Sequence, residues 1–464
     1  MYQKILFYLK KHENFPYKII LYALLIIISP AIFKILDHKF QKLFSLNRYI
    51  NIIDFIFLGI FSFWYLKKDK LKIKFSKNLI LLILYLLMAR LSIVFSKGEI
   101  HHRAYYDLFR ASILIFVLLS FFSETFQKHK KIVIKTILTL FFTFALLQTS
   151  IAILQFILQK PLGFTFLHEP FFAHNLGGSC KIQIAENSQF FLKYLPSQNN
   201  LFLRAHGTFI HPNVLSGFLN VSSLLTLYFI YKSKNKIFSL FLFFQIIALI
   251  LTFSRAGLAS FVVSSFCFFI LMLYKKYRVK KMFLSFLVII LSLGVIGSKQ
   301  LIERGFLGSS FQSKDASLMN KQSDFIRESL KNVSINMIKK HPYFGVGFRN
   351  FLIKRNEYSK IPVQRAYVHN IYLLIAAETG LISLLIFLML IFFTIYETFR
   401  YSLNPISITS ICIILSFMLI GFFDHYPIAS NFGRMVILSF LSLLNYFNEL
   451  NKPFSYSQKA SLYQ

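Results

Sequence analysis

Long apolar runs recur along the whole chain of 464 residues, and no other feature of the sequence limits its fold as strongly. A helix needs about 20 mostly apolar residues to cross the hydrocarbon core of a bilayer. Twelve such runs can be placed, of which the short second and last are the weakest: 17–36, 50–66, 79–96, 107–122, 132–158, 209–231, 237–253, 256–274, 282–298, 380–398, 403–422 and 432–447. The pattern predicts an all-α integral membrane protein with about 12 transmembrane helices.

The composition excludes the main soluble classes. Hydrophobic residues make up 56% of the chain and charged residues only 15%. A soluble fold of this size needs more charge to cover its surface, so a soluble enzyme or a nucleic-acid-binding protein is excluded. The net charge of +34 comes from lysines that lie in short clusters between apolar runs. Such clusters are typical of membrane topology, and we expect no nucleic-acid partner.

The basic clusters also predict the orientation. They follow even-numbered runs, at residues 67–77, 128–131, 232–236 and 275–281. Because short cytoplasmic loops are rich in Lys and Arg, we expect both termini in the cytoplasm and two long polar segments, 159–208 and 299–368, outside. The expected division is an N-terminal bundle, a first outer loop, central helices, a second outer loop with a surface helix, and C-terminal helices with a tail: 1–158, 159–208, 209–298, 299–379 and 380–464.

Several cofactor patterns are missing from the sequence. It contains no Asp-x-Asp pair, no Gly-Lys-Ser/Thr loop of the nucleotide-binding kind and no His-Glu-x-x-His. Its three cysteines form no metal-binding or disulfide pattern. We therefore expect no metal and no other cofactor.

Two polar clusters at the predicted outer face carry arginine. Arg204, His211 and Asn213 lead into the sixth run, where Pro212 suits a helix start. Free N–H groups at such a start favour an anion, and Arg204 adds a planar fork for phosphate oxygens. Arg255 lies in the tight hairpin between the seventh and eighth runs. Both arginines are equally consistent with side chains that only snorkel to the interface. If they share an anion, they should approach one another.

A third cluster lies in and after the second outer segment. Ser323 is expected to cap a surface helix over 324–340, which ends in a turn at 341–347. The apolar face of that helix would consist of Ile326, Leu330, Val333 and Met337. His369 and Asn370 then precede a short apolar helix. Histidine can take a proton near neutral pH, although a lone histidine at a helix start is usually a cap.

The fourth cluster is Asp424 with His425, before the last run. An adjacent Asp–His pair could orient an imidazole or bind a sugar hydroxyl. A polar interface turn is an equally good interpretation from the sequence.

Together these clusters resemble the O-antigen ligase and polymerase superfamily of bacterial envelope glycosyltransferases. The matching stretches occur in the family's order in the C-terminal 60% of the chain: RAHGTFIHPNVLSG (204–217), TFSRAG (252–257), PYFGVGFRNF (342–351) and HNIYLLIAAETG (369–380). The last stretch departs mildly from the ligase pattern, which continues Gly-x-x-Gly/Thr/Tyr, because Ser383 occupies the final position. The five N-terminal runs match only as apolar helices.

The resemblance implies a lipid-dependent glycosyltransferase of the GT-C type in the bacterial inner membrane. Members of this superfamily transfer a glycan from undecaprenyl pyrophosphate to a lipid or glycan acceptor at the outer face, without metal or nucleotide. Carried over to this chain, the resemblance assigns the pyrophosphate to Arg204 and Arg255 and the acceptor hydroxyl to His369. The remaining polar residues are candidates for substrate binding: His211, Asn213, Asn370, Asp424 and His425.

The sequence leaves the acceptor open. The reaction could be ligation to lipid A–core, polymerisation of the glycan, or transfer to a protein side chain. A polytopic flippase or transporter for lipid-linked sugars is a different class that also stays open. The asymmetric polar loops, the missing similarity between the two halves and the few charges inside the runs weigh against it.

Overall fold

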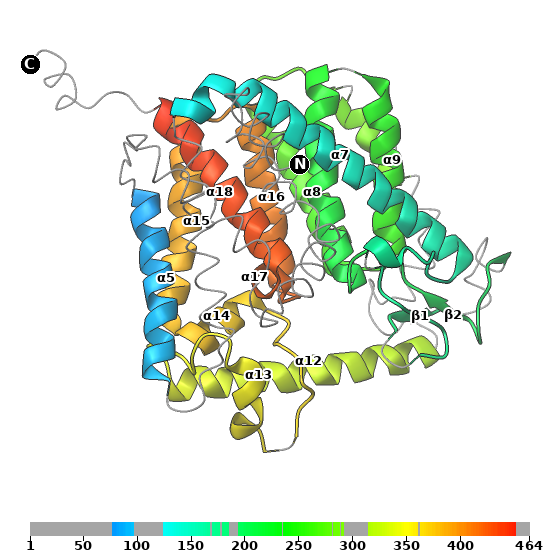
Figure 1. The fold of residues 1–464 in the computed structure, drawn as a ribbon, viewed down its shortest axis with the longest axis vertical. Coiled ribbons are helices and arrows are strands. Elements are labelled where there is room, and N and C mark those ends of the chain that lie inside the picture. Colours follow the sequence, from blue (N-terminus) through cyan, green and yellow to red (C-terminus); the bar gives the residue numbers. More distant parts are fainter. Residues whose placement is uncertain are drawn as a thin grey trace, which may run out of the picture.

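The computed structural model describes residues 77–96, 124–291 and 314–451, apart from positions 168, 177–178, 185–193, 234, 281, 288 and 361. This part of the chain is mostly helical, as predicted (Figure 1). The long helices are α5 (Lys77–Phe95), α7 (Glu124–Leu158), α8 (Pro212–Ser233), α9 (Lys236–Leu251), α10 (Arg255–Tyr274), α12 (Lys314–Lys340), α15 (Leu381–Tyr401), α16 (Pro405–Gly421) and α18 (Asn431–Asn451). The predicted runs 17–36, 50–66 and 107–122 lie outside the described residues.

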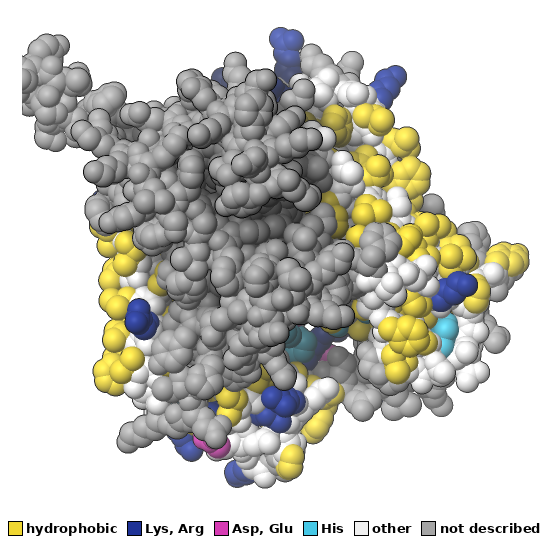
Figure 2. All heavy atoms as spheres, viewed as in Figure 1, with side chains coloured by type: hydrophobic (Ala, Val, Ile, Leu, Met, Phe, Trp, Pro, Cys, Tyr) yellow, Lys and Arg dark blue, Asp and Glu magenta, His cyan; other side chains and the backbone are white. Residues whose placement is uncertain are grey.

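Five helical segments are long and apolar enough to cross a membrane: Lys77–Phe95, Phe141–Leu158, Pro212–Ser233, Arg255–Tyr274 and Leu381–Tyr401. Shorter apolar helices are Lys236–Leu251, Met282–Leu291 and Pro405–Gly421. Figure 2 shows hydrophobic side chains over much of the lateral surface that the described residues form. These findings agree with an all-α membrane protein, while the number of spans, the orientation and the five-part division stay predictions.

One large apolar core joins the long helices. Its fully buried members come from helices distant in sequence, among them Phe156 of α7, Phe218 of α8, Phe268 of α10 and Phe417 of α16. Side-chain caps fix where several of these helices begin. Ser254 accepts a hydrogen bond from Gly257 N at the start of α10, and Asn404 accepts one from Ser407 N at the start of α16. The helix starts near the site are therefore well defined.

The polar segment 159–208 contains a short antiparallel hairpin. β1 (Lys181–Gln183) pairs with β2 (Leu201–Leu203), with Ile182 opposite Phe202. A 3₁₀ turn, η1 (Thr165–Leu167), precedes the hairpin.

The second outer segment is organised by α12, which lies across one end of the bundle in Figure 1. The predicted apolar face is confirmed, because Leu330, Val333 and Met337 are buried against Val346, Phe351 and Leu374. The predicted start is wrong. α12 begins at Lys314, ten residues before the expected helix, so Ser323 lies inside it and is no cap. The polar stretch 314–323 offers no apolar periodicity from which its helical state could be read.

Four short helices complete this region: α13 (Phe351–Lys354), η5 (Arg355–Tyr358), α14 (Ile371–Thr379) and α17 (Tyr426–Ala429). The turn after α12 packs against the break between α14 and α15. Gly380 has φ +89°, and a Cβ there would lie 1.9 Å from the carbonyl oxygen of Tyr343. Only glycine fits at this contact, which locks the second outer segment to α14.

Candidate functional site

The side chain of Arg204 is held in place by two hydrogen bonds. Its Nε donates to the carbonyl oxygen of Thr252 at 2.7 Å, and its Nη2 donates to Oδ1 of Asn213 at 2.8 Å. Only 5% of Arg204 is exposed. The backbone just after Arg204 is fixed by α7, since Oε1 of Gln155 accepts hydrogen bonds from the N–H groups of His206 and Gly207. Arg204 therefore presents a guanidinium whose direction is set by the fold.

Asn213 connects Arg204 to the other end of the site. Its Oδ1 accepts from Arg204, and its Nδ2 donates to Oδ2 of Asp424 at 2.6 Å. The backbone N–H of Asn213 donates to Nδ1 of His211 at 3.1 Å, so His211 caps the start of α8. Burial, and then the charge of Arg204, lower the pKa of His211 to about 3. His211 is thus a neutral cap.

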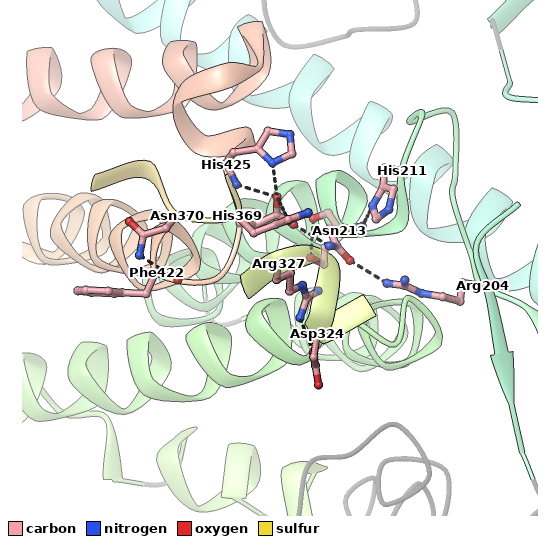
Figure 3. A network of polar contacts seen from close by, with 11 residues as sticks. Arg204, His211, Asn213, Asp324, Arg327, His369, Asn370, Phe422 and His425 are labelled. Carbon is pink, nitrogen blue, oxygen red and sulfur yellow. Dashed lines mark hydrogen bonds and ion pairs between the residues drawn. The ribbon is translucent and has the colours of Figure 1, made fainter. Parts of the chain in front are cut away.

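Asp424 collects contacts from two histidines. Its Oδ1 lies 3.6 Å from Nδ1 of His369 and 3.3 Å from Nδ1 of His425, and it accepts a hydrogen bond from His425 N at 2.8 Å. The two imidazole rings lie 5.2 Å apart between centroids. Burial would raise the pKa of Asp424, but the contact with His369 and the neighbouring histidines outweigh it and hold that pKa below its usual range. Asp424 is therefore an ionised carboxylate beside two imidazoles. Figure 3 shows these imidazoles, of His369 and His425, in the polar network.

Asn370 has a role in the fold. Its Oδ1 caps α14 by accepting from Leu373 N at 2.9 Å, and its Nδ2 donates to the carbonyl oxygen of Phe422 at 3.2 Å. These two bonds tie the start of α14 to the end of α16. They place His369, one residue before the cap, next to Asp424.

Arg255 faces the surface helix. Its Nη2 lies 3.8 Å from Oδ1 of Asp324, and the same oxygen lies 3.7 Å from Nη1 of Arg327. Because Arg204 binds the carbonyl oxygen of Thr252, it lies against the same hairpin that ends in Arg255. Burial lowers the pKa of Arg204, and the charges of Arg327 and Arg255 act in the same direction. This geometry supports the expected approach of Arg204 and Arg255.

Asp324 and Arg327 are two further candidates that the sequence did not indicate, because nothing in the pattern of α12 says which neighbour its polar face contacts. The sequence also did not indicate Glu378, which is buried at the end of α14 and accepts from Phe351 N at 3.3 Å. Burial raises the pKa of Glu378 to about 7, against the opposing charge of Arg349. Arg349 itself is buried and donates to Tyr367 Oη and to the carbonyl oxygen of Ala429. Both residues lie inside the quoted motifs, which was the available signal.

One group of side chains has the composition of a metal site. The ligand atoms of His369, Asp424 and His425 all lie within 4.8 Å of one another. Two imidazoles and a carboxylate suit zinc or iron by ligand type. However, both carboxylate oxygens of Asp424 already accept hydrogen bonds, from Asn213 and from His425 N. The expectation of no metal stays a prediction.

Comparison with known proteins adds the family. Residues 240–388 match the family model described as O-antigen ligase. The resemblance to the O-antigen ligase and polymerase superfamily is confirmed. The matched region contains Arg255, Asp324, Arg327 and His369, whereas Arg204 precedes it and Asp424 follows it. The fold thus brings to the matched region partners that the family model does not cover. No curated protein matches the chain.

Proposed function

We propose that this protein is a membrane glycosyltransferase that moves a glycan from undecaprenyl pyrophosphate to a hydroxyl group of an acceptor at the outer face of the bacterial inner membrane. One observation carries the proposal. A continuous set of contacts runs from Arg204 through Asn213 and Asp424 to His369, so a cation and a base belong to one site. Glycan transfer requires a cation at the leaving pyrophosphate and a base at the acceptor hydroxyl, held in one site.

The donor end of the site, which contains Arg204 and Arg255, binds the pyrophosphate. The bonds of Arg204 to Thr252 and Asn213 use two of its five N–H donors. The remaining donors can bind phosphate oxygens, and Arg255 adds a second guanidinium from the neighbouring hairpin. The pyrophosphate gains negative charge as it leaves, so cations aimed at it stabilise the transition state more than the ground state.

The acceptor end of the site, which contains His369 and Asp424, activates the acceptor hydroxyl. Nδ1 of His369 faces Asp424, which leaves Nε2 to accept a proton. The acceptor oxygen attacks the anomeric carbon, its proton passes to Nε2 of His369, and the bond from that carbon to the pyrophosphate oxygen breaks with its electron pair on the pyrophosphate. Asp424 stabilises the imidazolium that forms, and the proton then passes to solvent.

The acceptor is lipid A–core in the ligase form of the proposal. The growing glycan, or a protein side chain, is the acceptor in the other two reactions of the superfamily. All three use the same donor and the same proton transfer. The orientation that this requires, with both termini in the cytoplasm, rests on the lysine distribution.

The test is transfer by the purified protein. The protein in detergent is given lipid-linked glycan and, separately, lipid A–core, glycan and peptide acceptors, and products are separated by mass. We expect one acceptor to gain glycan while undecaprenyl pyrophosphate is released. If no acceptor is glycosylated, and vesicles containing the protein instead move lipid-linked glycan between leaflets, the flippase alternative replaces this proposal.

A further inference from the structure

The surface helix α12 supplies a third guanidinium group to the donor end. One oxygen of Asp324 lies 3.8 Å from Nη2 of Arg255 and 3.7 Å from Nη1 of Arg327. A single carboxylate oxygen thus serves cations from two elements, α10 and α12. Figure 3 shows Asp324 and Arg327 beside the network that joins Arg204 to the histidines.

Among the described residues, three guanidinium groups at this end are accompanied by the two carboxylates of Asp324 and Asp424. Arg204, Arg255 and Arg327 interact electrostatically: burial lowers the pKa of Arg204, Cys180 and Asp424 act to raise it, and the charges of Arg327 and Arg255 act to lower it. Asp324 contacts Arg255 and Arg327, whereas Asp424 is bonded to Arg204 through Asn213 and also acts on its charge. Like charges so placed favour an additional anion.

Asp324 is weakly held. Its side chain is 58% exposed, and both of its ion pairs are close to 4 Å. Exposed pairs of this kind contribute little to stability. Arg327, by contrast, is 32% exposed and lies one turn before Leu330, which is fully buried. Arg327 therefore stays in position when the carboxylate turns away.

We propose that Arg327 is a third donor-binding cation and that Asp324 is its internal competitor, which pairs with Arg255 and Arg327 until the donor's pyrophosphate takes its place. The inference rests on the proposed donor. Pyrophosphate carries more charge and more oxygens than one carboxylate, and guanidinium groups bind phosphate oxygens in pairs. The displacement breaks two weak ion pairs and forms stronger ones.

The test measures binding of inorganic pyrophosphate, and then of undecaprenyl pyrophosphate, to the full-length protein in detergent by calorimetry. Asp324→Asn should bind about two- to fivefold more tightly, the range for removing exposed ion pairs. Arg327→Gln should bind about tenfold more weakly, as expected for a lost charge-assisted hydrogen bond. Glu328→Gln is the matched control, because Glu328 is on the same helix and pairs with Lys331 at 3.3 Å instead.

The double variant isolates the competition. If Asp324 acts by holding Arg327, the gain from Asp324→Asn should shrink when Arg327 is already Gln. The inference fails if Asp324→Asn binds like Glu328→Gln, or if Arg327→Gln and Arg327→Lys both bind like the unchanged protein. If Arg204→Gln leaves pyrophosphate binding unchanged, the proposed donor site itself is wrong. Thermal unfolding of each variant confirms that it is folded.

Discussion

The two ends of the network hold their key side chains by opposite means. At the donor end, Arg204 is 5% exposed and its two hydrogen bonds go to uncharged oxygens of Thr252 and Asn213. At the acceptor end, His369 is 25% exposed and lies beside the ionised carboxylate of Asp424. A guanidinium is always charged, so uncharged anchors leave its charge available for a substrate. An imidazole must gain a charge during the reaction, so a charged neighbour stabilises the form that it becomes.

The largest effect should come from breaking the acceptor end alone. His369→Ala should lower turnover by roughly 100- to 10,000-fold, the range for removing a general base, and leave donor binding nearly unchanged. Transfer rates and calorimetric binding of undecaprenyl pyrophosphate measure the two quantities separately. His341→Ala is the control, since His341 hydrogen-bonds Tyr358 outside the network. A His369→Ala protein that transfers glycan at the normal rate would sink the assignment of the base.

Breaking the donor end should weaken binding as well as turnover. Arg204→Lys keeps the positive charge but loses the planar guanidinium group that hydrogen-bonds both Thr252 and Asn213. We expect transfer to fall about 10- to 100-fold, as for a lost hydrogen bond to a charged group, with weaker binding of pyrophosphate. The measurement is the transfer rate at several donor concentrations. Full activity in Arg204→Lys would mean that a point charge is enough there.

The stability of the region around Glu378, at the end of α14, should depend on pH. Burial raises the pKa of Glu378 from 4.5 to about 7. Between these values the folded protein keeps a proton that the unfolded chain has lost, so the free energy of unfolding should fall as pH rises, by roughly 3–4 kcal/mol in total. Glu378→Gln should remove this part of the pH dependence. Thermal unfolding of both proteins at pH 5 and pH 8 measures it, and equal slopes would contradict the buried neutral carboxyl.

The smallest expected effect is that of a chelator. If His369, Asp424 and His425 form an acid–base cluster, dialysis against EDTA should leave transfer unchanged, because no step needs a metal. The measurement is transfer before and after dialysis, together with elemental analysis of the protein. Lost activity that zinc or manganese restores would make the acceptor end a metal centre and remove the contrast with the donor end.

The sequence predicted those parts of the site that depend on local order. The sequence placed His369 and Asn370 before a short helix, but it offered the histidine as the possible cap, whereas the side chain of Asn370 accepts from Leu373 N. The buried face of α12 followed from the spacing of its apolar residues. Asp424 beside His425 was visible because the two are adjacent.

Contacts between distant segments were beyond the sequence. Asn213 meets Asp424 across 211 positions because α8 packs against α16, and the sequence gives no measure of that packing. The place of Asp424 beside His369 depends on the tie from Asn370 to Phe422. Asp324 and Arg327 lie near Arg255 because α12 crosses the end of the bundle. The start of α12 at Lys314 could not be predicted, because residues 314–323 show no apolar periodicity.

The length of α12 lets one helix reach both ends of the network. The helix has 27 residues and so measures about 40 Å, and only ten residues separate Arg327 from the buried Met337, about 15 Å. Arg327 contacts the donor end, whereas Met337 packs in the same cluster as Leu374 of α14, the helix that begins just after His369. A substitution that displaces α12 should therefore disturb the surroundings of Arg255 and the packing of α14 together.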